Sequence, residues 1–163
     1  MVSRRCDRRR RAARHAVTDE ELRALGFVPL SLEFTAAPVP LGTGTGCLWT
    51  TVGDVPDSPG LYAFTVAAGD RQHVTYVGRT GHLWMVTKGV LPRGGGSRPG
   101  QRYGRPKYAG VTRQRVNMLV GAERALGRRV DHWVRPLDEE LLRLEEETLI
   151  MRWRLRATGW NRG

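Results

Sequence analysis

Lysine is nearly absent from this chain, which contains only Lys88 and Lys107 among its 27 Lys and Arg residues. Guanidinium groups therefore supply almost all of the basic charge, and each can bind a phosphate through two parallel hydrogen bonds. With 16 acidic residues the formal net charge is +11, which favours a polyanionic partner, most commonly nucleic acid. A genomic base-composition bias would explain the arginine-to-lysine ratio equally well, but it would not explain the net charge.

Cysteine and long apolar runs are also scarce. Cys6 and Cys47 are far apart and form no CxxC pair, so we expect neither a zinc site nor a disulfide framework. The uncharged stretch from Thr35 to Gly53 is interrupted by prolines and glycines, which excludes it as a membrane-spanning helix. No apolar run follows the N-terminal arginines, so a secretory signal is not expected. These absences predict a cytoplasmic location and no membrane partner.

A chain of 163 residues has the size of one domain with appendages. Residues 1–17 are rich in arginine and poor in apolar side chains, which predicts a disordered basic arm. A start codon annotated upstream of the true one is the alternative explanation. Residues 18–54 form a predicted helix and strand extension. In this extension Thr18 and Glu21 make a capping box, a strand covers 27–34, and a loop covers 36–46.

The remaining part, residues 55–163, has a clearer pattern. Two β-rich runs, 61–66 and 73–77, flank a short turn and predict an antiparallel hairpin. We then expect a long loop over 89–110, a helix over 112–126, a strand over 128–137, and a helix capped by Asp138 that ends near Leu155. This order predicts an α/β or α+β fold with a small, mainly antiparallel three-stranded sheet flanked by helices, against which the N-terminal helix and strand pack.

Four short motifs lie in order on these predicted elements: Gly60-Leu61-Tyr62, Tyr76-Val77-Gly78, Glu146 followed by Leu149-Ile150, and Trp160-Asn161. Each motif alone occurs by chance in many proteins. Together, and in this order, they resemble the GIY-YIG nuclease family. The resemblance covers residues 55–163 and implies a GIY-YIG-like nuclease domain.

Glu146 is also unusual without reference to any family. At 100° per residue, the last predicted helix places Leu142, Leu149 and Ile150 on one face, and Glu146 falls inside that apolar stripe. Of the two neighbouring glutamates, Glu145 lies at the edge of the stripe and Glu147 points away, so we rank Glu146 first, Glu145 second and Glu147 third. In the alternative, the helix is rotated and all three glutamates are solvated.

The resemblance implies a role for each motif residue. Glu146 would hold one Mg2+ (or Mn2+), a hard cation that prefers carboxylate and phosphate oxygens. Tyr62 would be the general base, although a free phenol has a pKa near 10, and Tyr76 would position water or phosphate. Arg79 would contact the phosphate, and Asn161 would tie down the glutamate helix and the edge of the site. Either tyrosine could instead be an ordinary strand aromatic.

The chain departs from the family at one position. The family places an arginine on a helix about ten residues after the second motif tyrosine, and Val86 stands there. Three alternatives are open: Arg113 or Arg115 takes this role, Arg79 suffices, or the enzyme is impaired.

The predicted long loop combines cations with Tyr103 and Tyr108, a composition that suits phosphate neutralisation and base stacking. A solvated loop without a partner is the alternative. The candidate nucleic-acid contacts are Arg79, Arg98, Arg102, Arg105, Lys107 and Arg113. His132, by contrast, alternates with apolar strand residues and is interpreted as a packed side chain.

We therefore predict a metal-dependent endonuclease that hydrolyses phosphodiester bonds in DNA. A catalytically inactive GIY-YIG-like module that only binds nucleic acid is the principal alternative. A basic protein that binds RNA is a third.

Overall fold

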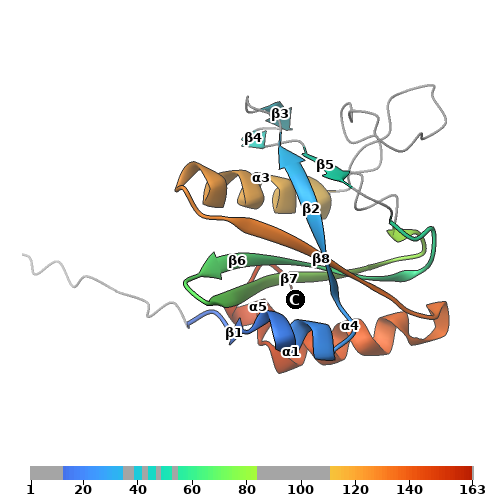
Figure 1. Cartoon of the computed structure of the whole chain (residues 1–163). Helices are drawn as coiled ribbons and strands as arrows, with labels where there is room; N and C mark the ends of the chain where they lie inside the picture. The colour runs from blue at the N-terminus through green and yellow to red at the C-terminus, as the bar shows by residue number, and fades with distance from the viewer. Residues whose placement is uncertain are drawn as a thin grey trace, which may run out of the picture.

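The computed structural model describes residues 13–34, 39–41, 44–46, 49–52, 55–83 and 111–162. Its elements combine helices with an antiparallel sheet, so the fold is α+β (Figure 1). In chain order the elements are β1 (Ala16–Val17), α1 (Asp19–Ala24), β2 (Val28–Phe34), β3 (Val39–Leu41), β4 (Gly44–Gly46), β5 (Trp49–Val52), β6 (Gly60–Ala68), β7 (Arg71–Thr80), α3 (Val111–Ala125), β8 (Val130–Pro136), the 3-10 turn η1 (Glu139–Leu141), α4 (Leu142–Arg152) and α5 (Leu155–Thr158).

The main sheet has six strands in the order β1-β7-β6-β8-β2-β5, and every neighbouring pair is antiparallel. The predicted three-stranded sheet corresponds to its centre, β7-β6-β8, and understates its width. The outer edge of β8 would leave backbone groups unpaired, and β2 pairs with them. The strands of the N-terminal extension are therefore part of the sheet, whereas α1 packs against it as predicted.

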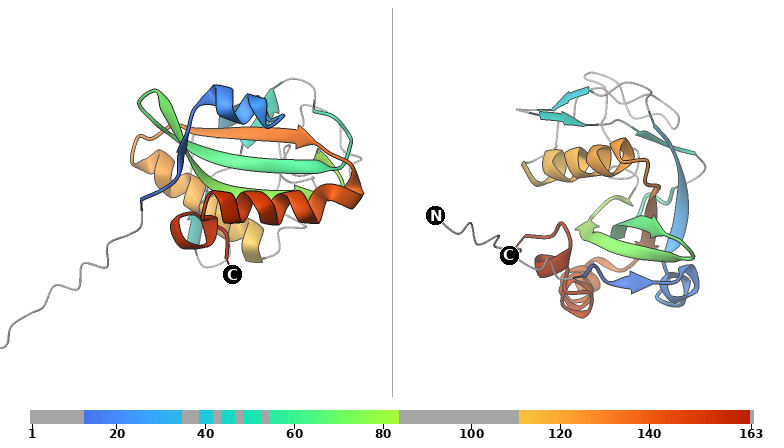
Figure 2. Two further views of the ribbon diagram at one scale, coloured as in Figure 1. Left: turned by 90° about the horizontal axis from the view of Figure 1, so that it is seen from below. Right: turned by 90° about the vertical axis from the view of Figure 1, so that its left-hand side faces the viewer.

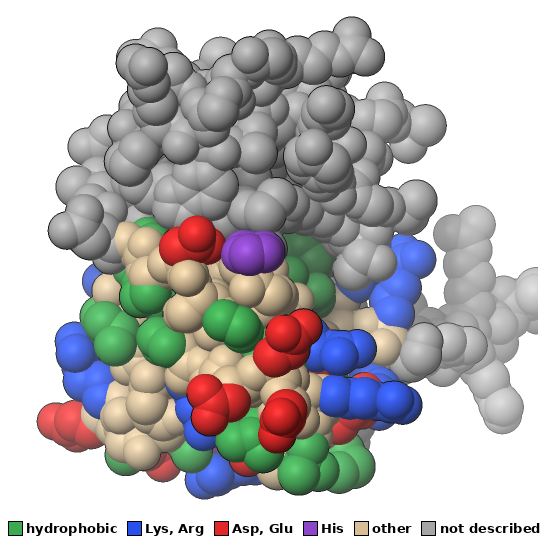
Figure 3. Space-filling model, turned by 90° about the vertical axis from the view of Figure 1, so that its right-hand side faces the viewer, with side chains coloured by type: hydrophobic (Ala, Val, Ile, Leu, Met, Phe, Trp, Pro, Cys, Tyr) green, Lys and Arg blue, Asp and Glu red, His purple; other side chains and the backbone are tan. Residues whose placement is uncertain are grey.

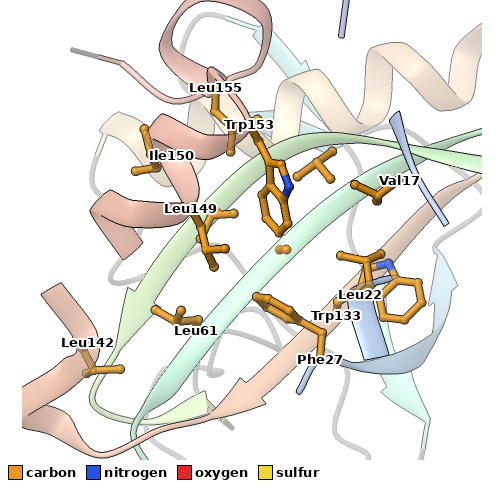
Figure 4. Packing of buried hydrophobic residues seen from close by; sticks show 13 residues of the cluster. Val17, Leu22, Phe27, Leu61, Trp133, Leu142, Leu149, Ile150, Trp153 and Leu155 are labelled. Carbon is orange, nitrogen blue, oxygen red and sulfur yellow. The ribbon is translucent and has the colours of Figure 1, made fainter. Parts of the chain in front are cut away.

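Helices cover both faces of this sheet. The right-hand view of Figure 2 shows α3 on one side and α1, α4 and α5 on the other. The larger core lies on the second side, where Trp133 and Trp153 are almost fully buried. Figure 4 shows these side chains converging between α1, the sheet and α4. A smaller aromatic and aliphatic cluster lies between the sheet and α3.

Several local predictions are confirmed. Thr18 accepts a hydrogen bond from the backbone N–H of Glu21 (3.1 Å), and the Glu21 side chain accepts one from the N–H of Thr18 (2.6 Å), which completes the capping box. The hairpin, the helix over 112–126 and the strand over 128–137 appear as β6-β7, α3 and β8. None of the helices in the described ranges is long and apolar enough to cross a membrane.

Three local predictions are wrong. The predicted arm over 1–17 is too long, because Ala16–Val17 pair with β7 as β1. The predicted loop over 36–46 contains β3 and β4, which pair with each other. Asp138 makes no side-chain cap, since its backbone carbonyl instead accepts from the N–H of Leu141 within a 3-10 turn that precedes α4. The predicted loop over 89–110 lies outside the described residues.

The last helix also ends earlier than predicted. Arg154 adopts a left-handed backbone conformation with φ of 54°, which separates α4 from the short helix α5. This break redirects the chain, so that Trp160 and Asn161 come back to β7.

Candidate active site at the edge of strand β7

The glycines of the two hairpin motifs are required by close packing. Tyr62 pairs with Gly78 across the hairpin, and a Cβ atom at Gly78 would lie 2.5 Å from Cζ of Tyr62. A Cβ atom at Gly60 would lie 2.5 Å from the carbonyl oxygen of Arg135 on β8. Each glycine therefore allows a neighbouring group to lie directly against the strand, and Gly78 determines where the Tyr62 ring sits.

The two motif tyrosines lie together on the face of the sheet that α3 covers. The rings of Tyr62 and Tyr76 have centroids 5.8 Å apart and are tilted by 42°. Phe64 and His132 complete the aromatic group, with their centroids 4.4 Å apart. His132 is fully buried, which confirms its interpretation as a packed strand residue. Its centroid lies 6.0 Å from that of Tyr62, a proximity that sequence periodicity could not reveal.

Glu146 forms an ion pair with Arg79 on the opposite face of the same hairpin. Arg79 Nε lies 2.8 Å from Glu146 Oε2, and the two side chains are 48% and 16% exposed. Burial raises the pKa of Glu146, Arg79 acts against this rise, and the charge of Glu147 adds to it. The arginine therefore offsets part of the desolvation that disfavours the charged carboxylate.

The neighbouring glutamates have other partners. Glu145 pairs with Arg135 at 2.9 Å, and Glu147 pairs with Arg156 at 2.7 Å. The side chains of Glu146, Glu145 and Glu147 are 16%, 33% and 44% exposed, which is the order of burial that the helical periodicity predicts. Glu146 is thus the most enclosed of the three carboxylates on this helix.

Asn161 binds the outer edge of β7 through both ends of its amide. Its Oδ1 accepts from the N–H of Val77 (3.1 Å), and its Nδ2 donates to the carbonyl of Val77 (2.7 Å). The N–H of Trp160 donates to the carbonyl of Thr75 at 2.5 Å. The predicted tie is therefore made to the strand, and the chain end covers an edge that would otherwise expose unpaired backbone groups.

The candidate residues form two groups on opposite faces of β7. Side chains alternate along a strand, so Arg79 shares the α4 face with Val77, whereas Tyr76 shares the α3 face with Tyr62. The structure brings the two tyrosines together and brings Arg79 to Glu146. The two groups can approach a common ligand only around the edge of β7, beside Gly78.

The other candidate cations divide into described and undescribed residues. Arg115, on α3, donates from Nη2 to the backbone carbonyl of Trp160. The side chain of Arg113 and the position of Val86 lie outside the described residues, as do the four loop cations Arg98, Arg102, Arg105 and Lys107. On the face shown in Figure 3, acidic and basic side chains of the described residues are intermixed rather than gathered into one basic patch.

Glu146 is the carboxylate that the family resemblance assigns to a metal ion. Among the described residues, no group of three or more His, Cys, Asp or Glu side chains could hold a metal. Mg2+ is compatible with such a site, because it commonly takes one carboxylate and completes its shell with water and substrate phosphate oxygens. Glu146 Oε2 already accepts a cation in the form of Arg79, so its environment tolerates positive charge.

Comparison with protein-family models, curated proteins and solved structures gave no match for this chain. The resemblance to GIY-YIG nucleases therefore depends on the four motifs and on the elements that carry them.

Proposed function

We propose that the chain is a metal-dependent endonuclease of the GIY-YIG type that hydrolyses phosphodiester bonds in DNA. The observation that carries this proposal is the enclosed carboxylate of Glu146, held by Arg79 on the hairpin that bears both motif tyrosines. Burying a carboxylate on the apolar face of a helix is costly, and its pKa is raised by that burial. Perturbed carboxylates of this kind are concentrated at functional sites.

Each residue has a distinct task in this proposal. Glu146 would hold Mg2+ or Mn2+, which would neutralise phosphate charge and lower the pKa of bound water. Arg79 donates to a phosphate oxygen and stabilises the charge that develops there. Tyr62 takes a proton from the attacking water at Oη, and Tyr76 orients the water or phosphate. Asn161 fixes the edge of β7, the strand that carries Tyr76 and Arg79.

The two-sided arrangement constrains the path of the substrate. A phosphodiester that reaches both Tyr62 and Glu146 has to lie along the edge of β7 near Gly78, where the strand carries no side chain of its own. Arg79 must then exchange the Glu146 carboxylate for a phosphate oxygen. The net charge of +11 supports binding of the polyanion along this path.

A catalytically inactive nucleic-acid-binding module is the second candidate, and one observation favours it. Oε2 of Glu146 is occupied by Arg79, an arrangement that would persist if the pair served only to hold α4 against the hairpin. Such a module would bind nucleic acid equally well with and without metal. A preference for RNA without cleavage would support the third alternative.

Plasmid nicking at low salt, with Mg2+, Mn2+ or EDTA, tests the leading proposal. Metal-dependent nicking by the wild type should be lost in Glu146→Ala and reduced at least about a hundredfold in Tyr62→Phe, within the range typical of general bases. The matched control is Glu145→Ala, which removes the adjacent carboxylate and should retain activity. Equal nicking by wild type and Glu146→Ala would show that the glutamate is not the metal ligand. Metal-independent binding without nicking would favour the inactive module.

A further inference from the structure

Arg115 has a buried hydrogen-bond donor that the described residues leave unused. Its Nη2 donates to the carbonyl of Trp160, but its Nε is buried and has no acceptor within the described part of the chain. A guanidinium carries five N–H donors, and buried polar groups in folded proteins nearly always have partners. An acceptor supplied by a ligand would complete this set.

A second guanidinium belongs to Arg162, which follows two residues after Trp160, whose carbonyl accepts from Arg115. Burial lowers the pKa of Arg115, the charge of Arg162 lowers it further, and Tyr76 acts in the opposite direction. Among the described residues, no carboxylate is one of the groups that act on the charge of Arg115. Two like charges that are close together without a counter-charge destabilise each other, and a bound anion would remove that cost.

The chain end that carries Arg162 is held firmly against β7. Trp160 is bonded to Thr75 through its backbone N–H, and Asn161 is bonded to both backbone groups of Val77. Trp160 also packs in the cluster that contains Tyr76 and the α3 residue Val116. The backbone segments that carry the two arginines, in α3 and in the C-terminal turn, are therefore fixed near the strand that bears Tyr76. Arg115 is preorganised by its bond to Trp160 and loses little conformational entropy on binding, whereas the side chain of Arg162 is exposed.

We infer that Arg115 and Arg162 together bind one phosphate group of a nucleic-acid backbone, on the α3 side of β7 next to Tyr76. A phosphate oxygen would accept from Nε of Arg115, and the phosphate charge would neutralise the two guanidinium groups. The choice of nucleic acid as the source of the phosphate rests on the proposed function, whereas the existence of an anion site does not. The site adds a contact on the face opposite to Arg79, so the substrate would be held on both sides of β7.

Binding of a fluorescent DNA duplex, measured by anisotropy in EDTA over a series of salt concentrations, tests this inference. Arg162→Gln is the principal variant, because it leaves the bond from Arg115 to Trp160 in place. We expect it to weaken binding about fivefold to tenfold and to reduce the salt slope by about 0.9, the value for one lost phosphate contact. Arg124→Gln, at the exposed end of α3, is the matched control because it removes the same charge. It should change affinity less than twofold.

The Arg115→Gln variant should show the same loss, and the double variant should lose little more, because the two side chains share one phosphate. Arg115→Lys and thermal unfolding separate loss of binding from loss of the Trp160 contact. Titration with inorganic phosphate, followed by the 15N-1H signal of Arg115 Nε, distinguishes a free-phosphate site from a backbone-phosphate site. A response to inorganic phosphate combined with unchanged DNA binding in Arg162→Gln would refute the assignment to nucleic acid. Equal losses in Arg162→Gln and Arg124→Gln would refute the site.

These outcomes are independent of cleavage, because EDTA prevents metal-dependent cutting. A protein that never nicks DNA but requires Arg162 for binding would disprove the proposed nuclease and retain the phosphate site. A protein that nicks DNA and binds it normally without Arg162 would disprove the phosphate site and retain the proposed nuclease.

Discussion

Replacing Arg79 with glutamine should strengthen the binding of Mn2+ to the free protein. Arg79 Nε lies 2.8 Å from Glu146 Oε2, so a metal ion that binds this carboxylate competes with a guanidinium that is already present. Removing the arginine also removes the repulsion between its charge and the incoming ion. The same substitution should raise the pKa of Glu146 further, because Arg79 is the main influence that lowers it.

The size of the effect follows from the exposure of the pair. Arg79 is 48% exposed and Glu146 is 16% exposed, so solvent screens the interaction on one side only. Exposed ion pairs contribute about 0.2 to 1 kcal/mol, and removing one partner of a fully buried pair costs more because it leaves an uncompensated charge. About 1 kcal/mol is therefore a reasonable lower value for the free energy that a metal ion must supply to displace Arg79 from Glu146. It corresponds to an affinity gain of about fivefold, since 1.4 kcal/mol is a factor of ten.

Electron paramagnetic resonance of free Mn2+ measures this affinity directly without nucleic acid. Arg135→Gln is the matched control, because it breaks the adjacent ion pair with Glu145, 2.9 Å long, on the same helix. Only Arg79→Gln should gain affinity, and Glu146→Gln should lose binding. If Arg79→Gln binds Mn2+ no more tightly than the wild type, or if Arg135→Gln gains as much, Glu146 is not the ligand that competes with Arg79. With DNA present, Arg79→Gln should cut more slowly despite its tighter metal binding, because it has lost its phosphate contact.

Three further substitutions test the fold around the site. Gly78→Ala places a Cβ atom 2.5 Å from the Tyr62 ring. Nicking should therefore fall at least about tenfold, and the unfolding free energy measured in urea should fall by about 1 to 3 kcal/mol. Gly81→Ala is the control and should change neither quantity, because a Cβ atom there meets nothing within 4 Å. Asn161→Ala removes hydrogen bonds of 3.1 and 2.7 Å to β7 and should cost about 1 to 3 kcal/mol of unfolding free energy. Burial acts to raise the pKa of Glu123, but hydrogen bonds from two arginines lower it below 4.5 overall. The charged Glu123 carboxylate therefore stabilises the fold above pH 4.5, and this stabilisation is lost as pH falls through the folded-state pKa. The unfolding curves of Glu123→Gln and wild type should accordingly differ at pH 7 and converge in acid.

The parts of the fold that sequence predicts correctly are those determined by neighbouring residues. Thr18 and Glu21 are three positions apart and form their capping box without help from the rest of the chain. The hairpin follows from two β-rich runs and a turn in which Gly69 has a φ of 65°. The enclosed position of Glu146 follows from the spacing of apolar residues on one helix. In each case local geometry alone fixes the outcome.

The parts that sequence did not predict depend on pairing between distant segments. The width of the sheet depends on the pairing of β2 with β8, which lie about a hundred residues apart in the chain. The residues of β2 alone do not indicate which distant strand they pair with. The contact between Arg115 and Trp160 likewise joins α3 to the C-terminal turn. Alternation along β7 does predict that Tyr76 and Arg79 face opposite sides. The family resemblance nevertheless implies a single site for the motif residues, and that implication does not take the two faces of the strand into account.

The contacts of the candidate residues determine which variants can report on chemistry. Asn161 and Trp160 are bonded to the backbone of β7, so their loss would displace Arg115, Arg162 and the strand that carries Tyr76 at the same time. A loss of cutting in those variants would therefore be a consequence of altered structure. Arg79 is half exposed, and its loss affects one ion pair. It follows that a role in metal or phosphate binding has to be tested at Arg79, Glu146 and Arg162, each against a matched neighbour, with the Asn161 variant used only to measure stability.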